Sequence, residues 1–218
     1  RSTLFPYTTL FRSRDVTSNQ KPYTLTGLNP GTQYNFKVRG KHDNSELYSA
    51  WSNKAYFNTI QEPASLSYST NFETEGGWLL VNGACTNQWC WGEAAHNGEG
   101  THGLYISTDG GTTHAYTINS NTMVYAIKTF DFEAGVYSFS YDWFAKGEKN
   151  YDFLRVALVP DSLSLEAGIA LPTGFTYNTL PEGWIALDGG SQLNQATGWQ
   201  TASYISRSEE RVSRNAET

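Results

Sequence analysis

The sequence predicts an all-β protein, and three observations favour this fold class. Aromatic residues make up 15% of the 218 residues and charged residues only 17%, a composition that suits pleated sheets, on which aromatic and β-branched side chains pack well. Short strand-like runs recur at regular spacing between turns rich in Gly, Asn and Asp. No segment has a convincing helical period. We therefore expect antiparallel sheets throughout, packed as a sandwich or jelly roll in the larger, second part of the chain.

Residues 14–60 form the first predicted unit. Its strand-like runs lie at 22–28, 32–40 and 53–59. In the middle run Tyr34, Phe36 and Val38 alternate with polar residues. Because successive side chains of a strand point to opposite faces, this alternation predicts one apolar face and one solvated face.

The turn before this run carries a family resemblance. Pro30 presets its φ angle, and Gly31 can adopt the positive φ of a tight corner. The tyrosine corner of fibronectin type III domains is similar to the pattern made by Leu28, Pro30, Gly31 and Tyr34. The resemblance implies that the Tyr34 hydroxyl bonds to the backbone upstream. It also implies that residues 14–60 are the C-terminal part of such a domain, without its early strands.

A linker and a second unit follow. Residues 61–70 contain a proline and small polar residues, which are typical of a linker. The strand-like runs of the second unit, residues 71–206, lie at 77–83, 87–94, 102–107, 114–118, 123–130, 135–145, 152–159 and 183–187. The stretch STDGGTT predicts a hairpin turn in which Asp109 and Gly110 adopt positive φ angles.

The second unit also resembles a known family. The blocks NFETEGGW, HGLYISTDGGTTHAY and VYSFSYDWFAKGEKNYDFLRVALVP are similar, in sequence and in order, to the cleaved-adhesin surface proteins of Bacteroidota. Those proteins contain MAM-like jelly-roll domains, which commonly follow fibronectin type III modules. The resemblance implies that a final strand or two of the jelly roll is missing after residue 206.

Both ends of the chain differ in character from its body. Residues 3–13 resemble the translation of a short-read sequencing adaptor, and residues 207–218 resemble that of its companion adaptor. We therefore expect 1–13 and 207–218 to be adaptor-derived and poorly packed, and the natural part to be an internal fragment of a longer protein.

Composition narrows the function classes. The net charge of −6 argues against binding to a nucleic-acid backbone, which needs clustered Lys and Arg. No run approaches the roughly 20 apolar residues of a membrane span. No nucleophile elbow or phosphate-binding loop is present in the sequence. Glu148 and Asp152, four residues apart, are a carboxylate pair without the strand pattern of a glycosidase. We therefore expect the fragment not to be an enzyme.

Two cysteines lie close together in the stretch CTNQWC. With His96 and His102 downstream, Cys85 and Cys90 have the spacing C-x4-C-x5-H-x5-H. The residues between the two pairs are too few for the hairpin and helix of a zinc finger. The alternatives are a disulfide that closes a short loop, which would indicate an oxidising compartment, and two free thiols.

Tryptophans are dense in the second unit. Trp89 and Trp91 lie on the same face of one predicted strand, with Cys90 on the opposite face. Exposed Trp rings stack on sugar rings and contribute to interaction hot spots, whereas most Trp side chains of a sandwich fill its core. The two tryptophans are therefore candidate ligand-stacking residues.

The resemblance to cleaved adhesins also implies structural Ca²⁺ near the start of the second unit. The matching positions are Glu73 and Asp152, with Glu148 and Asp142 as further candidates. A hard divalent cation would relieve the repulsion within such a carboxylate cluster. A salt bridge to a nearby basic residue such as Arg155 would do the same without metal.

The sequence thus predicts a non-catalytic, extracellular binding module of a larger secreted or surface-attached bacterial protein. Its ligand would be a host or matrix protein or a carbohydrate. The alternative is an accessory domain of a secreted hydrolase or peptidase whose catalytic domain lies outside the fragment.

Overall fold

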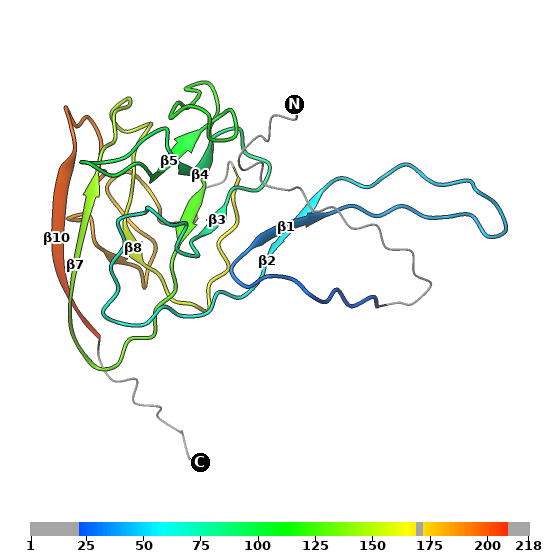
Figure 1. Cartoon of the computed structure of the whole chain (residues 1–218), viewed down its shortest axis with the longest axis horizontal. Coiled ribbons are helices and arrows are strands. Elements are labelled where there is room, and N and C mark those ends of the chain that lie inside the picture. Colours follow the sequence, from blue (N-terminus) through cyan, green and yellow to red (C-terminus); the bar gives the residue numbers. More distant parts are fainter. Residues whose placement is uncertain (1–21, 169–171, 209–218) are drawn as a thin grey trace, which may run out of the picture.

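The computed structural model describes residues 22–168 and 172–208, and all regular structure in these residues is β-strand (Figure 1). This confirms the predicted all-β class. The ten strands are β1 (Gln33–Phe36), β2 (Ala55–Asn58), β3 (Leu79–Val81), β4 (Gln88–Gly92), β5 (Gly103–Ser107), β6 (Tyr125–Ile127), β7 (Gly135–Trp143), β8 (Ala157–Leu158), β9 (Ile185–Ala186) and β10 (Gln200–Ser208).

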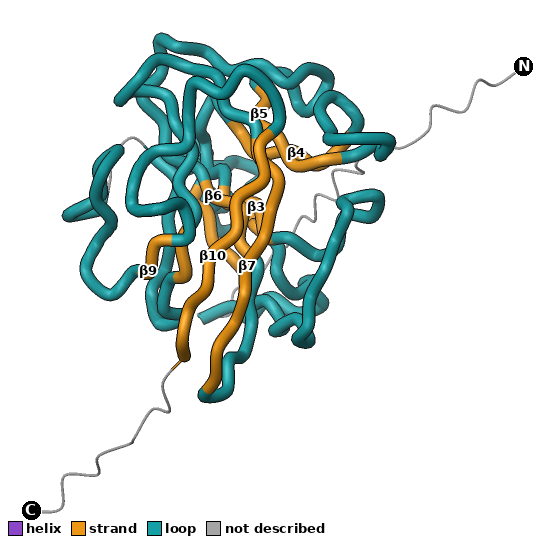
Figure 2. The backbone as a smooth tube through the Cα atoms, turned by 90° about the vertical axis from the view of Figure 1, so that its left-hand side faces the viewer, coloured by secondary structure: helices purple, strands orange, loops and turns teal. Residues whose placement is uncertain are grey.

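The strands pair in twos, and every pair is antiparallel: β1 with β2, β3 with β6, β4 with β5, β7 with β10, and β8 with β9. The longest ladder joins β7 and β10, which lie side by side along one face of the body (Figure 2). Strand β10 runs through Arg207 and Ser208, the first two residues of the stretch that resembles an adaptor. The rest of that stretch, and residues 1–13, lie outside the described residues.

The N-terminal hairpin of β1 and β2 extends away from the body (Figure 1). Gly31 has a φ of 55°, as predicted, and the backbone N–H of Asn29 donates to the Tyr34 hydroxyl at 2.9 Å. The hydrogen bond expected of a tyrosine corner is therefore present. The rings of Tyr34 and Phe36 lie 5.7 and 6.1 Å from that of Phe57, so the three rings form the apolar face of the hairpin.

Gln61, the first residue of the predicted linker, is anchored in the body. Its side-chain amide donates to the carbonyl oxygens of Gly77 (2.6 Å) and Ile127 (3.3 Å) and accepts from the backbone N–H of Thr129 (2.6 Å). The residue is only 8% exposed. Because strands β3 and β6 flank these contacts, Gln61 ties the hairpin to the larger unit, a role that the composition of the linker does not reveal.

Replacing Gln61 with alanine is expected to lower the free energy of unfolding by about 1–3 kcal/mol, because buried backbone groups lose their partners. Chemical denaturation followed by tryptophan fluorescence measures this change. The control is Gln200→Ala, since the Gln200 amide is exposed and bonds only to neighbouring carbonyls; its effect should stay within about 0.5 kcal/mol. Equal effects of the two substitutions would contradict the anchoring role.

Two predicted strands are not formed. Residues 114–118 make no ladder, and the backbone of Thr117 bonds to a side chain instead: the Asn87 amide donates to Thr117 O and accepts from Thr117 N at 3.2 and 2.9 Å. The predicted hairpin turn after β5 is therefore wrong as well. Residues 22–28 also form no strand, since no described segment pairs with them.

The turn residues in STDGGTT nonetheless form a compact loop. Gly110 and Gly111 have positive φ angles of 73° and 94°, but Asp109 does not. Instead, the Asp109 carboxylate accepts hydrogen bonds from Ser107 Oγ and from the backbone and side chain of Thr113. Asp109 thus shapes the turn through its side chain.

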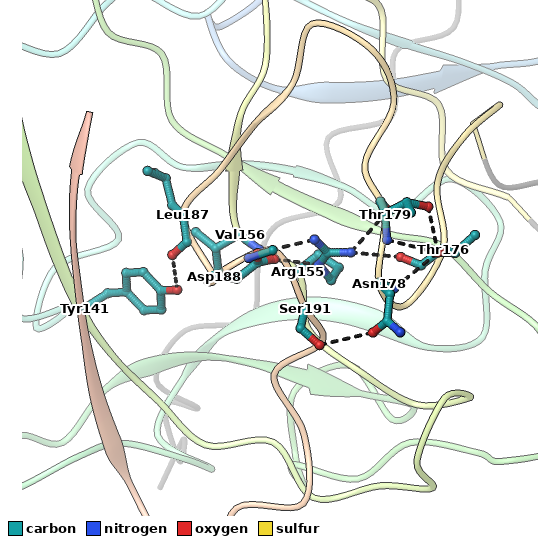
Figure 3. A network of polar contacts seen from close by, with 10 residues as sticks. Tyr141, Arg155, Val156, Thr176, Asn178, Thr179, Leu187, Asp188 and Ser191 are labelled. Atoms are coloured by element: carbon teal, nitrogen blue, oxygen red, sulfur yellow. Dashed lines mark hydrogen bonds and ion pairs between the residues drawn. The ribbon is translucent and has the colours of Figure 1, made fainter. Parts of the chain in front are cut away.

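A buried ion pair lies in the body (Figure 3). Arg155 Nε lies 2.5 Å from Asp188 Oδ2, and the two side chains are 4% and 0% exposed. The Asp188 carboxylate also accepts from the backbone N–H groups of Val156 and Gly190. The Arg155 guanidinium donates in turn to two backbone carbonyls of the 176–179 turn. This network joins β8 to the segment that follows β9, and Arg155 is therefore not a partner of the predicted calcium ligands.

Candidate functional site

The two candidate ligand-stacking tryptophans lie on β4 as predicted, with Cys90 on the opposite face. Both are half-buried, and each indole N–H has a partner inside the protein. Trp89 Nε1 donates to Val124 O at 3.3 Å, and Trp91 Nε1 donates to Phe72 O at 2.7 Å. These bonds fix the orientation of both rings, and Trp91 is thereby held beside the segment that contains Glu73.

His102 lies at the centre of a polar cluster next to Trp91. Its ring stacks on the Trp91 ring, with centroids 4.7 Å apart and planes inclined by 18°. Nδ1 lies 3.6 Å from Glu73 Oε2 and Nε2 lies 3.6 Å from Glu93 Oε1, while Thr101 Oγ1 is 2.7 Å from Nδ1. The imidazole is thus placed between two carboxylates and against an aromatic face.

The β4–β5 register explains why these groups meet. Gly92 pairs with Gly103 at the loop end of the β4–β5 hairpin. Glu93 and His102, the next residues on either side, therefore lie side by side where the strands join the loop. A side chain at Gly103 would collide with the carbonyl oxygen of Ala95. Glycine at this position therefore lets the 93–102 loop fold closely over the start of β5.

Glu73 is held by three hydrogen bonds. Oε1 accepts from the backbone N–H groups of Thr101 (2.8 Å) and His102 (3.2 Å), and Oε2 accepts from Thr101 Oγ1 (2.7 Å). These bonds, above all that of the Thr101 hydroxyl, lower the pKa of Glu73 from 4.5 to about 2. Glu73 is therefore an anion throughout the physiological range and orders the loop that carries His102.

The lowered pKa of Glu73 predicts an acid-sensitive contribution to stability. A carboxyl whose pKa is lower in the folded state contributes stability above its unfolded pKa and loses it as the pH falls toward the folded pKa. The window here runs from 4.5 down to about 2. We expect the melting temperature of the wild type to fall more steeply across this window than that of Glu73→Gln.

The control for this comparison is Glu46→Gln, which removes a carboxylate that is 87% exposed. Asp109 has a pKa lowered to about 2 by its bonds to Ser107 and Thr113, so part of the acid sensitivity remains in every variant. Parallel melting curves for the wild type and Glu73→Gln would contradict the assignment.

An open cavity of about 340 Å³ lies beside the His102 cluster and is lined by Glu93, His96 and Thr101. The three side chains offer a carboxylate, an imidazole and a hydroxyl, and thus both donors and acceptors. Between His96 and Thr101 the loop is tied to β7, because Asn97 Nδ2 donates to Asp142 Oδ2 at 2.7 Å. The cavity therefore has polar walls on a loop that is tied to β7 near its middle.

The predicted calcium ligands Glu73 and Asp152 bond to different partners in this structure. The Glu73 oxygens accept from Thr101 and His102, whereas Asp152 Oδ2 lies 3.3 Å from the Tyr116 hydroxyl and accepts from the backbone N–H of Glu148 at 3.2 Å. Among residues 22–168 and 172–208, no group of three or more His, Cys, Asp or Glu side chains is arranged to hold a metal ion. The implied Ca²⁺ site therefore remains an expectation from the resemblance.

Cys85 and Cys90 are both free thiols. Cys85 Sγ lies 3.9 Å from Met123 O, and Cys90 belongs to β4. Burial raises the pKa of both thiols, and Asp109 adds to the effect at Cys90. Of the two alternatives, this structure has the free thiols, and the raised pKa values keep both groups as thiols at neutral pH.

Sequence reasoning noticed His96 and His102 only as zinc candidates and missed Glu93 and Thr101 altogether. A usable signal was present, because strand-like runs on both sides of residues 93–102 predict a hairpin. In a hairpin the first and last loop residues meet, and here they are Glu93 and His102.

Comparisons with models of protein families, with curated proteins and with solved structures found no match for this chain. The resemblances to fibronectin type III and cleaved-adhesin domains thus remain expectations from sequence. Within the part of the chain that the structure describes, no helix has the length and apolar character needed to cross a bilayer.

Proposed function

We propose that this chain is a non-catalytic binding module that holds a small carbohydrate in the cavity lined by Glu93, His96 and Thr101. The observation that carries the proposal is that two residues lining this polar cavity, Glu93 and Thr101, contact His102, whose ring stacks on that of Trp91. Sugars present hydroxyl groups along their edges and apolar C–H groups on their faces. A site with fixed donors and acceptors next to an aromatic surface is complementary to both.

The electrostatics of the cluster favour binding over catalysis. A glycosidase needs one carboxylic acid with a raised pKa to protonate the leaving group. Glu73 has a pKa of about 2 instead, and the Glu93 side chain is 79% exposed to solvent. The raised pKa values of Cys85 and Cys90 likewise disfavour nucleophilic thiolates.

The size of the cavity favours a small ligand. Its volume of about 340 Å³ lies near the lower end of the range of small-molecule sites, which is room for one or two sugar rings at the end of a glycan. An extracellular location agrees with such a ligand, and the resemblance to surface adhesins supports it. In a parent protein with a catalytic domain, the same module would direct a hydrolase to its substrate.

A glycan array followed by calorimetric titration of the strongest hit tests the proposal. Glu93→Gln and Thr101→Val should each weaken binding by about tenfold or more, since a hydrogen bond to a charged or buried group is lost. Glu166→Gln, a substitution outside the cavity lining, is the matched control and should bind like the wild type. Absence of any glycan hit, or full affinity of both cavity variants, would contradict the proposed function.

A further inference from the structure

The charge of this chain is unevenly distributed. The hairpin of residues 33–58 carries four basic and two acidic residues, for a net charge of +2. The whole chain has a net charge of −6, so the rest of the chain carries −8. The basic residues of the hairpin are Lys37, Arg39, Lys41 and Lys54, and all four are exposed. A basic arm therefore extends from an acidic body (Figure 1).

The four basic residues belong to one face of the hairpin. Beyond β1 the chain stays paired with the returning segment, through Ser52 N to Val38 O, Ser49 N to Gly40 O, and a bridge from Lys41 to Tyr48. Alternation along this extended segment places Lys37, Arg39 and Lys41 on one side, at intervals of about 7 Å. Continuing the β1–β2 register, in which Phe36 pairs with Ala55, places Lys54 across from Lys37.

Arg39 is held rigidly on this face. Its guanidinium carbon lies 4.0 Å from the ring centre of Tyr48 and 4.3 Å from that of Trp51. Both aromatic side chains remain about half exposed. Stacking orders the planar guanidinium and leaves its N–H edge free for a carboxylate or sulfate group, which it can bind through two parallel hydrogen bonds. The cost of ordering this side chain on binding is correspondingly low.

Neither Glu46, the acidic residue that contacts Lys41, nor the hairpin's own apolar face covers the side of the hairpin that carries the basic residues. Lys41 contacts Glu46 at 3.0 Å, but both side chains are exposed, at 42% and 87%, and such pairs exchange partners readily. The rings of Tyr34, Phe36 and Phe57 lie on the opposite face. Packing of that apolar face against further strands would therefore leave the basic face in solvent.

We propose that this basic face binds an anionic polysaccharide that carries carboxylate or sulfate groups. The face consists of Lys37, Arg39, Lys41, Tyr48, Trp51 and Lys54. Three of its cations span about 14 Å along an extended strand, which matches a linear ligand with repeating charges. This second binding surface goes beyond the carbohydrate cavity and does not depend on it.

Titration of the full chain with heparin (sulfated), hyaluronan (carboxylated) and dextran (neutral) tests the proposal. We expect binding to at least one of the two polyanions and none to dextran. The dissociation constant should rise about 15-fold between about 50 and 200 mM NaCl, as for a flexible polyanion that contacts about three cations. Arg39→Gln/Lys41→Gln should weaken binding by about tenfold or more.

Lys146→Gln/Lys149→Gln is the matched control, because it removes the same charge from two exposed lysines elsewhere on the chain, and it should stay within about twofold of the wild type. Glu93→Gln should also bind heparin normally, which separates this surface from the cavity. The near-ultraviolet circular dichroism of each variant checks its fold, and Arg39→Lys, which keeps the charge without the planar fork, should show an intermediate loss.

Three results would overturn the proposal. The first is no binding to either polysaccharide. The second is equal losses in the hairpin variant and the control variant. The third is tighter binding of poly-L-glutamate or single-stranded DNA than of both polysaccharides, which would assign the basic face to another class of partner.

Discussion

Replacing Arg155 with methionine is expected to lower the free energy of unfolding by about 3–5 kcal/mol. The substitution leaves the fully buried Asp188 carboxylate without its charge partner, although two backbone N–H groups still donate to it. It also removes the donors to the carbonyls of Thr176 and Thr179 (Figure 3). An uncompensated charge in a low-dielectric interior is the main cause of the loss.

The matched control is Lys41→Met, which breaks the exposed pair with Glu46 and should cost less than about 1 kcal/mol. Denaturant titrations of both variants measure the difference. The double variant Arg155→Met/Asp188→Leu should regain much of the loss, since no charge then remains buried. A single Arg155→Met variant as stable as the Lys41→Met control would contradict this account of the ion pair.

Gly103→Ala is expected to destabilise the protein by about 1–3 kcal/mol and to weaken glycan binding as well. The added methyl group would overlap the backbone at Ala95, and a backbone atom cannot move aside as a flexible side chain can. The 93–102 loop would have to shift, and with it Glu93 and His102. Stability and binding are therefore predicted to fall together.

Gly198→Ala is the control for this substitution, because a methyl group at Gly198 meets no atom within 4 Å. It should change the free energy of unfolding by less than about 0.5 kcal/mol and leave binding unchanged. Measuring both quantities for each variant tests the link. If Gly103→Ala bound glycans with the affinity of the wild type, the loop would not be held as described.

Alternation and turn chemistry were enough to predict the strands that carry the candidate site. The period of two in QWCWG and GLYIS predicted strands that the structure has as β4 and β5, and it placed Trp89 and Trp91 on one face. Pro30 and Gly31 likewise predicted the tight corner before β1, and the resemblance to a tyrosine corner implied the hydrogen bond to Tyr34. In each case the information is local, because it depends on residues only a few positions apart.

What the sequence could not predict depends on long-range partners. Asn87 bonds to the backbone of Thr117, thirty residues away, within a segment that was expected to be a strand. Asp188 lies thirty-three residues from Arg155, and nothing in the spacing marks either as buried. The partners of Glu73 are also distant in sequence, since Thr101 and His102 follow it by twenty-eight and twenty-nine residues.

The most direct test of the carbohydrate site is a two-dimensional ¹H–¹⁵N spectrum of the full chain, recorded during titration with the best glycan from the array. We expect progressive shifts of the backbone signals of residues 93–102 and of the indole N–H of Trp91, whose ring stacks on His102. The indole N–H of Trp89, which bonds to Val124, should move less. Saturable shifts confined to other residues, with no change at 93–102, would contradict the carbohydrate site.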